Sequence, residues 1–163
     1  MRTKKSTTIL AAFAALLMFA SGCNLPAKES AATVDNATLK KEIEAANAEF
    51  MDLLSQGDSV GLANSYTTDA KFMNAGAPAV SGRQNIQSAM SGIINSGITS
   101  ADIRTDAVWG SGEHLIEEGT LSLFVSGEEV AVEKFIVIWK KEDGKWKLFR
   151  DIFNSNVPAP AAD

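Results

Sequence analysis

Glu133 and Asp151 are the two residues of this sequence whose type and position could do chemistry. They lie in two runs rich in Val, Ile, Phe and Trp that flank Glu142-Asp143-Gly144. Such runs around a three-residue loop with Gly in the left-handed position predict a β-hairpin of two long strands. If Lys141 pairs with Lys145, alternation places six side chains on one face: Glu133, Phe135, Val137, Phe149, Asp151 and Phe153. Two carboxylates then share an aromatic surface.

Carboxylates that aromatic rings and neighbouring charges desolvate have raised pKa values and can act as general acids or bases. Each could instead hold a backbone amide, a water molecule or the guanidinium of Arg83. If Ser126 and Gly127 form a two-residue turn, Glu118 and Thr120 join the same face. The opposite face then carries a charge cluster that we interpret as solvated or interfacial, made of Glu117, Lys134 and Arg150.

Composition excludes several classes of function. The 163 residues carry a net charge of -5, and no basic stripe is present that could neutralise nucleic-acid phosphates. His114 is the sole histidine, at a hairpin tip where we expect it to face solvent, so no metal site is proposed. Phosphate-binding and dinucleotide fingerprints are missing, and we expect no cofactor. A small hydrophobic or amphipathic molecule, or a protein, is the expected partner.

The N-terminal segment has the pattern of a secretory signal. Basic residues precede an apolar run from Ile9 to Ala20, which is too short to span a bilayer. The following Ser21-Gly22-Cys23 resembles the lipobox of bacterial lipoproteins, which implies a signal peptide over residues 1–22 and lipidation of Cys23. Residues 23–36 have no apolar periodicity and are predicted to form a tether. The resemblance implies an extracytoplasmic domain anchored to the cell membrane or the outer membrane, which would be periplasmic in a Gram-negative host.

Residues 37–156 are predicted to form one folded domain, followed by a Pro/Ala tail over 157–163. Apolar residues at spacings of three and four predict a helix that begins near Ala37, with a second short helix after Asp58 and a third from Arg83 to about Ser96. A brief strand is expected over 69–73. Strands over 103–109 and 115–125 precede the final hairpin. Three helices followed by a four-stranded meander predict an α+β domain in which a curved sheet wraps around the first helix.

Several motifs of this domain resemble the SnoaL-like branch of the nuclear transport factor 2-like (NTF2-like) superfamily. They are Gln56-Gly57-Asp58, Tyr66-Thr67-Thr68-Asp69-Ala70, Ser81-Gly82-Arg83, the run from Trp139 to Lys147, and Arg150-Asp151. The resemblance covers nearly all of residues 37–156. It implies a cone of three N-terminal helices on a curved, mostly antiparallel sheet, with a pocket at the open end. Because this fold hosts isomerases, dehydratases, cyclases and binding proteins, it does not by itself give a function.

The ketosteroid isomerases of this superfamily provide a residue-by-residue comparison. Their oxyanion-hole Tyr would correspond to Phe50, their general-base Asp to Asn74, and their proton-donating Asp to Glu133. Phe50 has no hydroxyl, and Asn74 cannot accept a proton at neutral pH, so that proton shuttle is incomplete. We therefore predict a pocket for a small molecule rather than a ketosteroid isomerase. Its expected lining is Phe50, Tyr66, Asn74, Glu118, Phe135, Phe149 and Phe153, with Glu133 and Asp151.

Three functions stay open at this point. The first is a lipid-anchored ligand-binding domain without chemistry. The second is an isomerase, lyase or hydrolase that acts on a small hydrophobic substrate through Glu133 and Asp151. The third is an interaction module, because the other face of the hairpin is also apolar and predicts a homodimer. The residues of that face are Val132, Ile136, Ile138, Leu148 and Ile152.

Overall fold

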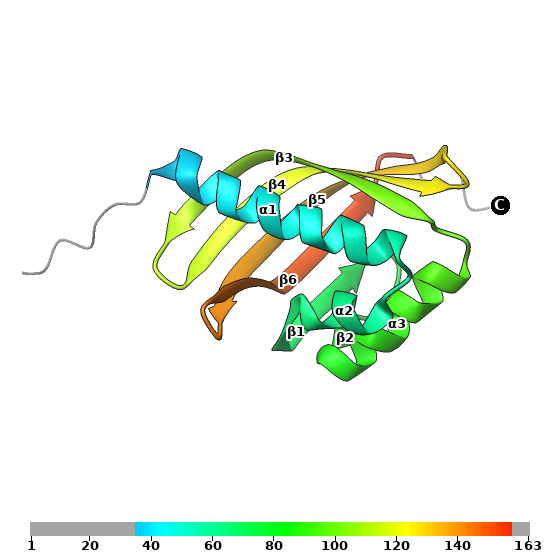
Figure 1. The fold of residues 1–163 in the computed structure, drawn as a ribbon, viewed down its shortest axis with the longest axis horizontal. Coiled ribbons are helices and arrows are strands. Elements are labelled where there is room, and N and C mark those ends of the chain that lie inside the picture. The colour runs from blue at the N-terminus through cyan, green and yellow to red at the C-terminus, as the bar shows by residue number, and fades with distance from the viewer. Residues whose placement is uncertain (1–34, 158–163) are drawn as a thin grey trace, which may run out of the picture. The chain divides into compact units, whose positions relative to one another are not determined.

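The computed structural model describes residues 35–157, in which three helices and six strands follow one another (Figure 1). The helices are α1 (Asn36–Ser55), α2 (Ser59–Asn64) and α3 (Arg83–Asn95). The strands are β1 (Tyr66–Asn74), β2 (Val80–Ser81), β3 (Ser100–Ser111), β4 (His114–Val125), β5 (Glu128–Glu142) and β6 (Lys145–Ser155). The predicted signal peptide, Cys23 and most of the predicted tether lie outside the described residues, as does nearly all of the C-terminal tail. Within residues 35–157, no helix is long and apolar enough to cross a membrane.

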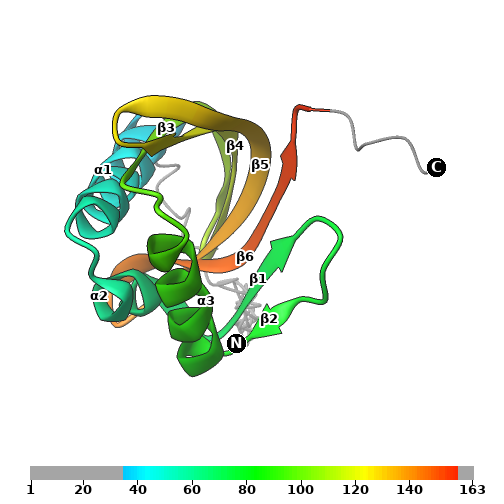
Figure 2. The same ribbon diagram turned by 90° about the vertical axis from the view of Figure 1, so that its right-hand side faces the viewer.

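The strands form one mixed sheet in the order β2-β1-β6-β5-β4-β3. The predicted meander of β3 to β6 is confirmed, but the sheet continues past it, because β1 pairs in parallel with β6. β1 is also longer than the strand predicted over 69–73, since it begins at Tyr66. The sheet curves so that its concave face turns toward the helices (Figure 2). The α+β class of the prediction is therefore correct, with two more strands than the meander.

α1 packs against this sheet along a stripe that its sequence spacing sets. Leu39, Ile43 and Leu54 are buried, as the helical period requires, and Asn47 is a buried polar residue on the same stripe. The helix ends where Gly57 adopts a φ of 69°, in the left-handed region that glycine tolerates best. Asp58 then caps α2, because its Oδ1 accepts a hydrogen bond of 2.8 Å from the backbone N–H of Gly61.

A β-bulge between β4 and β5 overturns the predicted placement of Glu118. The two-residue turn at Ser126-Gly127 is present, since Val125 pairs with Glu128. The register then shifts by one residue between Leu123 and Phe124, so that Glu117 lies opposite Val137. A shift of one residue exchanges the two faces of a strand. Glu117 consequently points to the concave side and is fully buried, whereas Glu118 is exposed on the convex side.

A second bulge, in β6, overturns the predicted placement of Phe149. Asp143 and Gly144 form a two-residue turn, both with positive φ, in place of the predicted three-residue loop. Ile138 pairs with Arg150 and Trp139 with Leu148, which leaves Phe149 unpaired in the ladder. Leu148 therefore takes the concave position and is buried, contrary to its predicted place on the apolar outer face.

On the convex side, Phe149 lies among basic side chains. The Arg150 guanidinium carbon is 3.6 Å from the centroid of the Phe149 ring, and Lys140 Nζ is 5.1 Å from it. Lys134 Nζ donates to the Ser155 carbonyl, so the predicted cluster of Glu117, Lys134 and Arg150 does not form. Glu117 is absent from the convex face because the bulge between β4 and β5 directs its side chain to the concave side.

Candidate functional site

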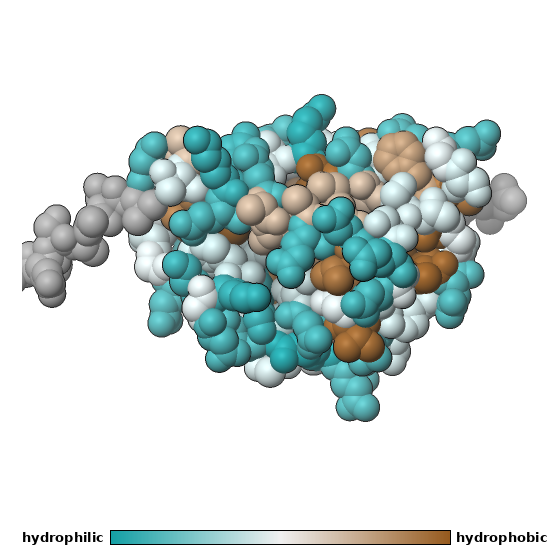
Figure 3. Space-filling view, viewed as in Figure 1, coloured by the Kyte–Doolittle hydropathy of each residue, from teal (hydrophilic) through white to brown (hydrophobic). Residues whose placement is uncertain are grey.

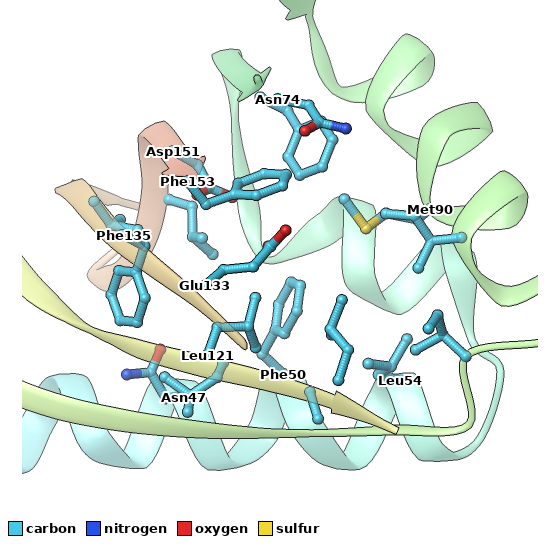
Figure 4. Close-up of a pocket in the computed structure, with 18 of the residues that line it drawn as sticks. Asn47, Phe50, Leu54, Asn74, Met90, Leu121, Glu133, Phe135, Asp151 and Phe153 are labelled. Carbon is cyan, nitrogen blue, oxygen red and sulfur yellow. The ribbon is translucent and has the colours of Figure 1, made fainter. Parts of the chain in front are cut away.

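A cavity of about 320 Å³ lies between the concave face of the sheet, α1 and α3 (Figure 4). Most of its lining is apolar: Phe50, Leu54, Phe72, Met90, Ile93, Ile98, Ala101, Ile103, Leu121, Leu123, Phe135, Val137, Leu148 and Phe153. The polar residues of the lining are Asn47, Tyr66, Asn74, Ser96, Glu133 and Asp151. The structure thus brings together all the predicted pocket residues except Glu118 and Phe149, which the two bulges direct to the other face.

Asp151 and Tyr66 form a buried pair in this cavity. The Tyr66 hydroxyl donates a hydrogen bond of 2.6 Å to Asp151 Oδ2, and Tyr66 has no exposed surface. Burial raises the pKa of Asp151 to about 6; the Tyr66 hydrogen bond opposes this, and the charges of Glu117 and Glu133 add to it. Burial and the charge of Asp151 raise the pKa of Tyr66 well above 10.0. Near neutral pH, this pair is a carboxylate held by a neutral phenol.

Glu133 presents the most unusual polar atom of the cavity. Its carboxylate points into the space between the rings of Phe50 and Phe153 (Figure 4). The Oε2 atom is buried, yet it has no hydrogen-bond partner among the described residues. Burial raises the pKa of this carboxyl. A buried acceptor without a partner costs about 1–3 kcal/mol, so its presence calls for an explanation.

Asn47, another polar residue of the lining, belongs to a network centred on Glu117. Glu117 Oε1 accepts from Asn47 Nδ2 at 2.7 Å and from Thr105 Oγ1 at 2.6 Å, and Oε2 accepts from the Trp139 indole N–H at 2.8 Å. Burial raises the pKa of Glu117, and the three hydrogen bonds oppose that shift. The network ties α1 to β3, β4 and β5 and fixes Asn47 at the cavity wall. Glu117 itself has every acceptor oxygen occupied and acts as a structural anchor.

A family profile of the SnoaL-like domain matches residues 48–149, which include most of the cavity lining. This chain belongs to the SnoaL-like domain family. The match confirms the resemblance seen in the sequence. A comparison with curated proteins finds no match.

Solved structures support the NTF2-like fold of the SnoaL-like domain. An NTF2-like protein with a cystatin-like fold from Novosphingobium aromaticivorans superposes with a TM-score of 0.65 at 17% identity, over 74% of this chain and 83% of that chain. A protein from Streptomyces avermitilis described as a candidate dehydratase of the NTF2-like family gives 0.63 at 16% identity, over 76% and 100%. A ketosteroid isomerase-like protein from Erwinia carotovora atroseptica gives 0.57 at 20% identity, over 72% and 96%. At these identities the likeness establishes the fold alone.

Arg83, one of the suggested partners for the pocket carboxylates, is engaged elsewhere in the SnoaL-like domain. Its guanidinium donates to the Tyr66 carbonyl and to Glu142 Oε1, which also accepts from Lys147 Nζ at 3.1 Å. The Thr68 backbone N–H contributes most to lowering the pKa of Glu142 to about 2. This cluster connects the start of β1 to the β5–β6 turn. Glu133 and Asp151 therefore receive no ion pair from it.

Two residues of the site, Asn47 and Gly119, were not predicted from the sequence, although each has a recognisable sequence signal. Asn47 follows Ile43 by four residues, so the helical period alone places this polar side chain on the buried stripe. Gly119 stands inside a strand, which often marks a close approach. A Cβ built on Gly119 would collide with the Arg104 carbonyl oxygen and would lie 2.7 Å from Phe135 Cζ, so the Phe135 ring occupies that space. Within the described residues, no group of His, Cys, Asp and Glu side chains could hold a metal ion.

Proposed function

We propose that this SnoaL-like domain binds a small, mainly apolar molecule that carries at least one hydrogen-bond donor. The observation that carries the proposal is the unpaired Oε2 atom of Glu133, buried in a cavity whose other walls are mostly aromatic and aliphatic. A donor on the ligand would satisfy that oxygen. The volume of about 320 Å³ is at the lower end of the ~300–1,000 Å³ typical of ligand pockets, which favours a compact molecule.

A pair of neighbouring substitutions on β4 tests the proposal. Leu121 lines the cavity, whereas the preceding residue of the strand, Thr120, faces the convex side beside Lys134, contrary to its predicted place on the pocket face. We expect the wild-type chain to bind 7-amino-4-methylcoumarin, a compact uncharged dye whose amino group is a hydrogen-bond donor. Leu121→Trp should weaken binding by about tenfold or more by filling the cavity, and Thr120→Trp should keep it. Dye fluorescence titration measures all three. Equal binding by Leu121→Trp and wild type would place the dye outside the cavity and contradict the proposal.

A catalytic role is the second candidate, favoured by the Tyr66–Asp151 pair. A general base works best when its pKa is close to the working pH, and the pKa of Asp151 is raised to about 6. Together with Glu133, Asp151 could transfer protons to or from a small hydrophobic substrate. The domain would then be an isomerase, a lyase or a hydrolase. Exchange of solvent deuterium into a compact apolar ketone distinguishes this role from binding alone. Exchange that requires Asp151 would indicate catalysis.

We also propose that the domain is held at a membrane surface by a lipid on Cys23. The lipobox-like Ser21-Gly22-Cys23 supports this, as does the position of the only cysteine. In cells, Cys23→Ser is expected to abolish incorporation of a labelled fatty acid and to shift the protein out of the detergent phase. Ser21→Ala keeps a small residue before the cysteine, so this matched control should still incorporate the label. Lipidation of the Cys23→Ser protein would refute the anchor.

The convex face of the sheet supports a further proposal, that two copies associate through it. Ile136 is 46% exposed and Ile152 42%, and they lie opposite each other on β5 and β6. By contrast, the face that α1 occupies is covered mainly by hydrophilic side chains (Figure 3). Ile136→Asp is expected to shift the sedimentation coefficient from dimer to monomer, because it places a charge in an apolar interface. A wild-type protein that sediments as a monomer at high concentration would contradict this interface.

A further inference from the structure

The charged side chains that line the cavity are all acidic. The lining contains the carboxyl groups of Glu133 and Asp151, and Glu117 lies behind Asn47. No Lys, Arg or His occurs among the lining residues of the described chain. Arg83 and Lys147 lie outside this lining, and both pair with Glu142. Two carboxylates in an apolar cavity without a cation carry a desolvation cost that no opposite charge in the lining offsets.

We propose that the molecule bound in this cavity is a protonated amine on a compact apolar body. The inference rests on the proposed function, since it concerns the charge of the ligand rather than the existence of a binding site. Its ammonium group would lie beside Glu133 Oε2, the atom left without a partner. Its apolar body would fill the space between α3 and the sheet.

The Glu133 carboxylate lies between the rings of Phe50 and Phe153 (Figure 4), which favours a cation over a neutral donor. Phe50 and Phe72 each pack edge-on against Tyr66, with ring centroids 6.2 Å and 6.3 Å away, and Phe72 lies 5.0 Å from Phe153. The faces of such rings attract ammonium groups, and the attraction strengthens when water is excluded. An alcohol could donate to Glu133 but would leave the negative charge of the cavity uncompensated. A carboxylate ligand would meet like charges.

The ionisation of the cavity groups gives the proposal a pH signature. Three groups act on the Asp151 carboxyl: Tyr66 donates to it, and the charges of Glu117 and Glu133 repel its own. No basic side chain of the described residues lines the cavity beside it. A bound cation would favour the ionised carboxyl groups and lower their pKa values, so binding would release protons. Affinity for an amine would therefore fall as the pH drops below about 6, when the Asp151 carboxyl becomes neutral.

Three probes of one shape test the inference: aminoadamantane, hydroxyadamantane and adamantane carboxylate. Titration calorimetry on the full chain at about pH 7.5 is expected to give the amine an affinity about tenfold or more above that of the alcohol, with the carboxylate weakest. Glu133→Gln is expected to lower amine affinity about tenfold and to change alcohol affinity about twofold or less. Glu118→Gln, on the convex face, removes the same charge outside the cavity and should change neither. Asp151→Asn provides a second cavity variant if Glu133→Gln does not fold.

Equal affinity of the amine and the alcohol would overturn the inference, as would tighter binding of the carboxylate. So would an amine affinity that Glu133→Gln and Asp151→Asn leave unchanged. If 7-amino-4-methylcoumarin binds and none of the three probes does, the inference fails while the binding function stands. If Leu121→Trp leaves dye binding unchanged, the proposed function fails independently of the charge of the ligand.

Discussion

Glu117→Ala is expected to lower the free energy of unfolding by about 3–5 kcal/mol. The substitution removes the carboxylate that accepts hydrogen bonds from Asn47, Thr105 and Trp139. Because Glu117 is fully buried, these three donors would lose this acceptor inside the protein. Each buried donor without a partner costs about 1–3 kcal/mol, reduced where the site relaxes or admits water. Urea unfolding, followed by far-ultraviolet circular dichroism, measures the loss.

Glu118→Ala is the matched control for this prediction. It removes the same side chain one residue further along β4, where the side chain is exposed on the convex face. Its effect on the free energy of unfolding should stay within about 0.5 kcal/mol. Similar losses for the two variants, or a larger loss for Glu118→Ala, would show that the bulge between Leu123 and Phe124 does not direct Glu117 inward.

Asp151→Asn is expected to stabilise the domain by about 1–3 kcal/mol near neutral pH. The amide keeps an oxygen that can accept from the Tyr66 hydroxyl, and it removes a buried negative charge. A rise of the pKa from 3.8 to about 6 corresponds to about 3 kcal/mol of unfavourable ionisation in the folded state. The charge would be retained despite this cost because it serves ligand binding or proton transfer.

The sign of the pH dependence follows from the raised pKa. Between about pH 4 and 6, folded Asp151 holds its proton while the unfolded chain has lost it. The contribution of Asp151 to stability is therefore complete below about pH 4 and is lost as the pH rises through about 6. Glu133 and Glu117 shift in the same direction, so the difference between wild type and Asp151→Asn isolates the part due to Asp151.

Urea unfolding at a series of pH values tests this prediction. The stability advantage of Asp151→Asn should grow from about pH 4 to about pH 7 and then level off. Phe153→Leu is an apolar change in the same cavity, so its difference in stability from wild type should not increase with pH. A constant difference between Asp151→Asn and wild type would mean that Asp151 titrates as an ordinary exposed carboxyl. A loss of stability at neutral pH would mean that the charge-assisted bond from Tyr66 outweighs burial.

The sequence by itself determined the family and most of the elements. The Gly57-Asp58 cap and the apolar spacing of α1 predict the first two helices. The Ser126-Gly127 turn and the loop predicted at Glu142-Asp143-Gly144 locate the hairpins of β4, β5 and β6. These features are local, because propensities, caps and turn residues act within a few positions. Glu133 and Asp151 were placed on the correct face although the predicted register was wrong. The observed pairing differs by two residues, and an even shift preserves the face.

Only the tertiary structure decided which other side chains enter the cavity. A one-residue bulge exchanged Glu118 for Glu117, and another exchanged Phe149 for Leu148; neither bulge has a sequence signature as clear as that of a turn. The parallel pairing of β1 with β6 brings Tyr66 to Asp151, 85 positions away in the chain. Propensity and periodicity carry no information on such a distant contact, because closure of the sheet, rather than either segment alone, brings the phenol and the carboxylate together.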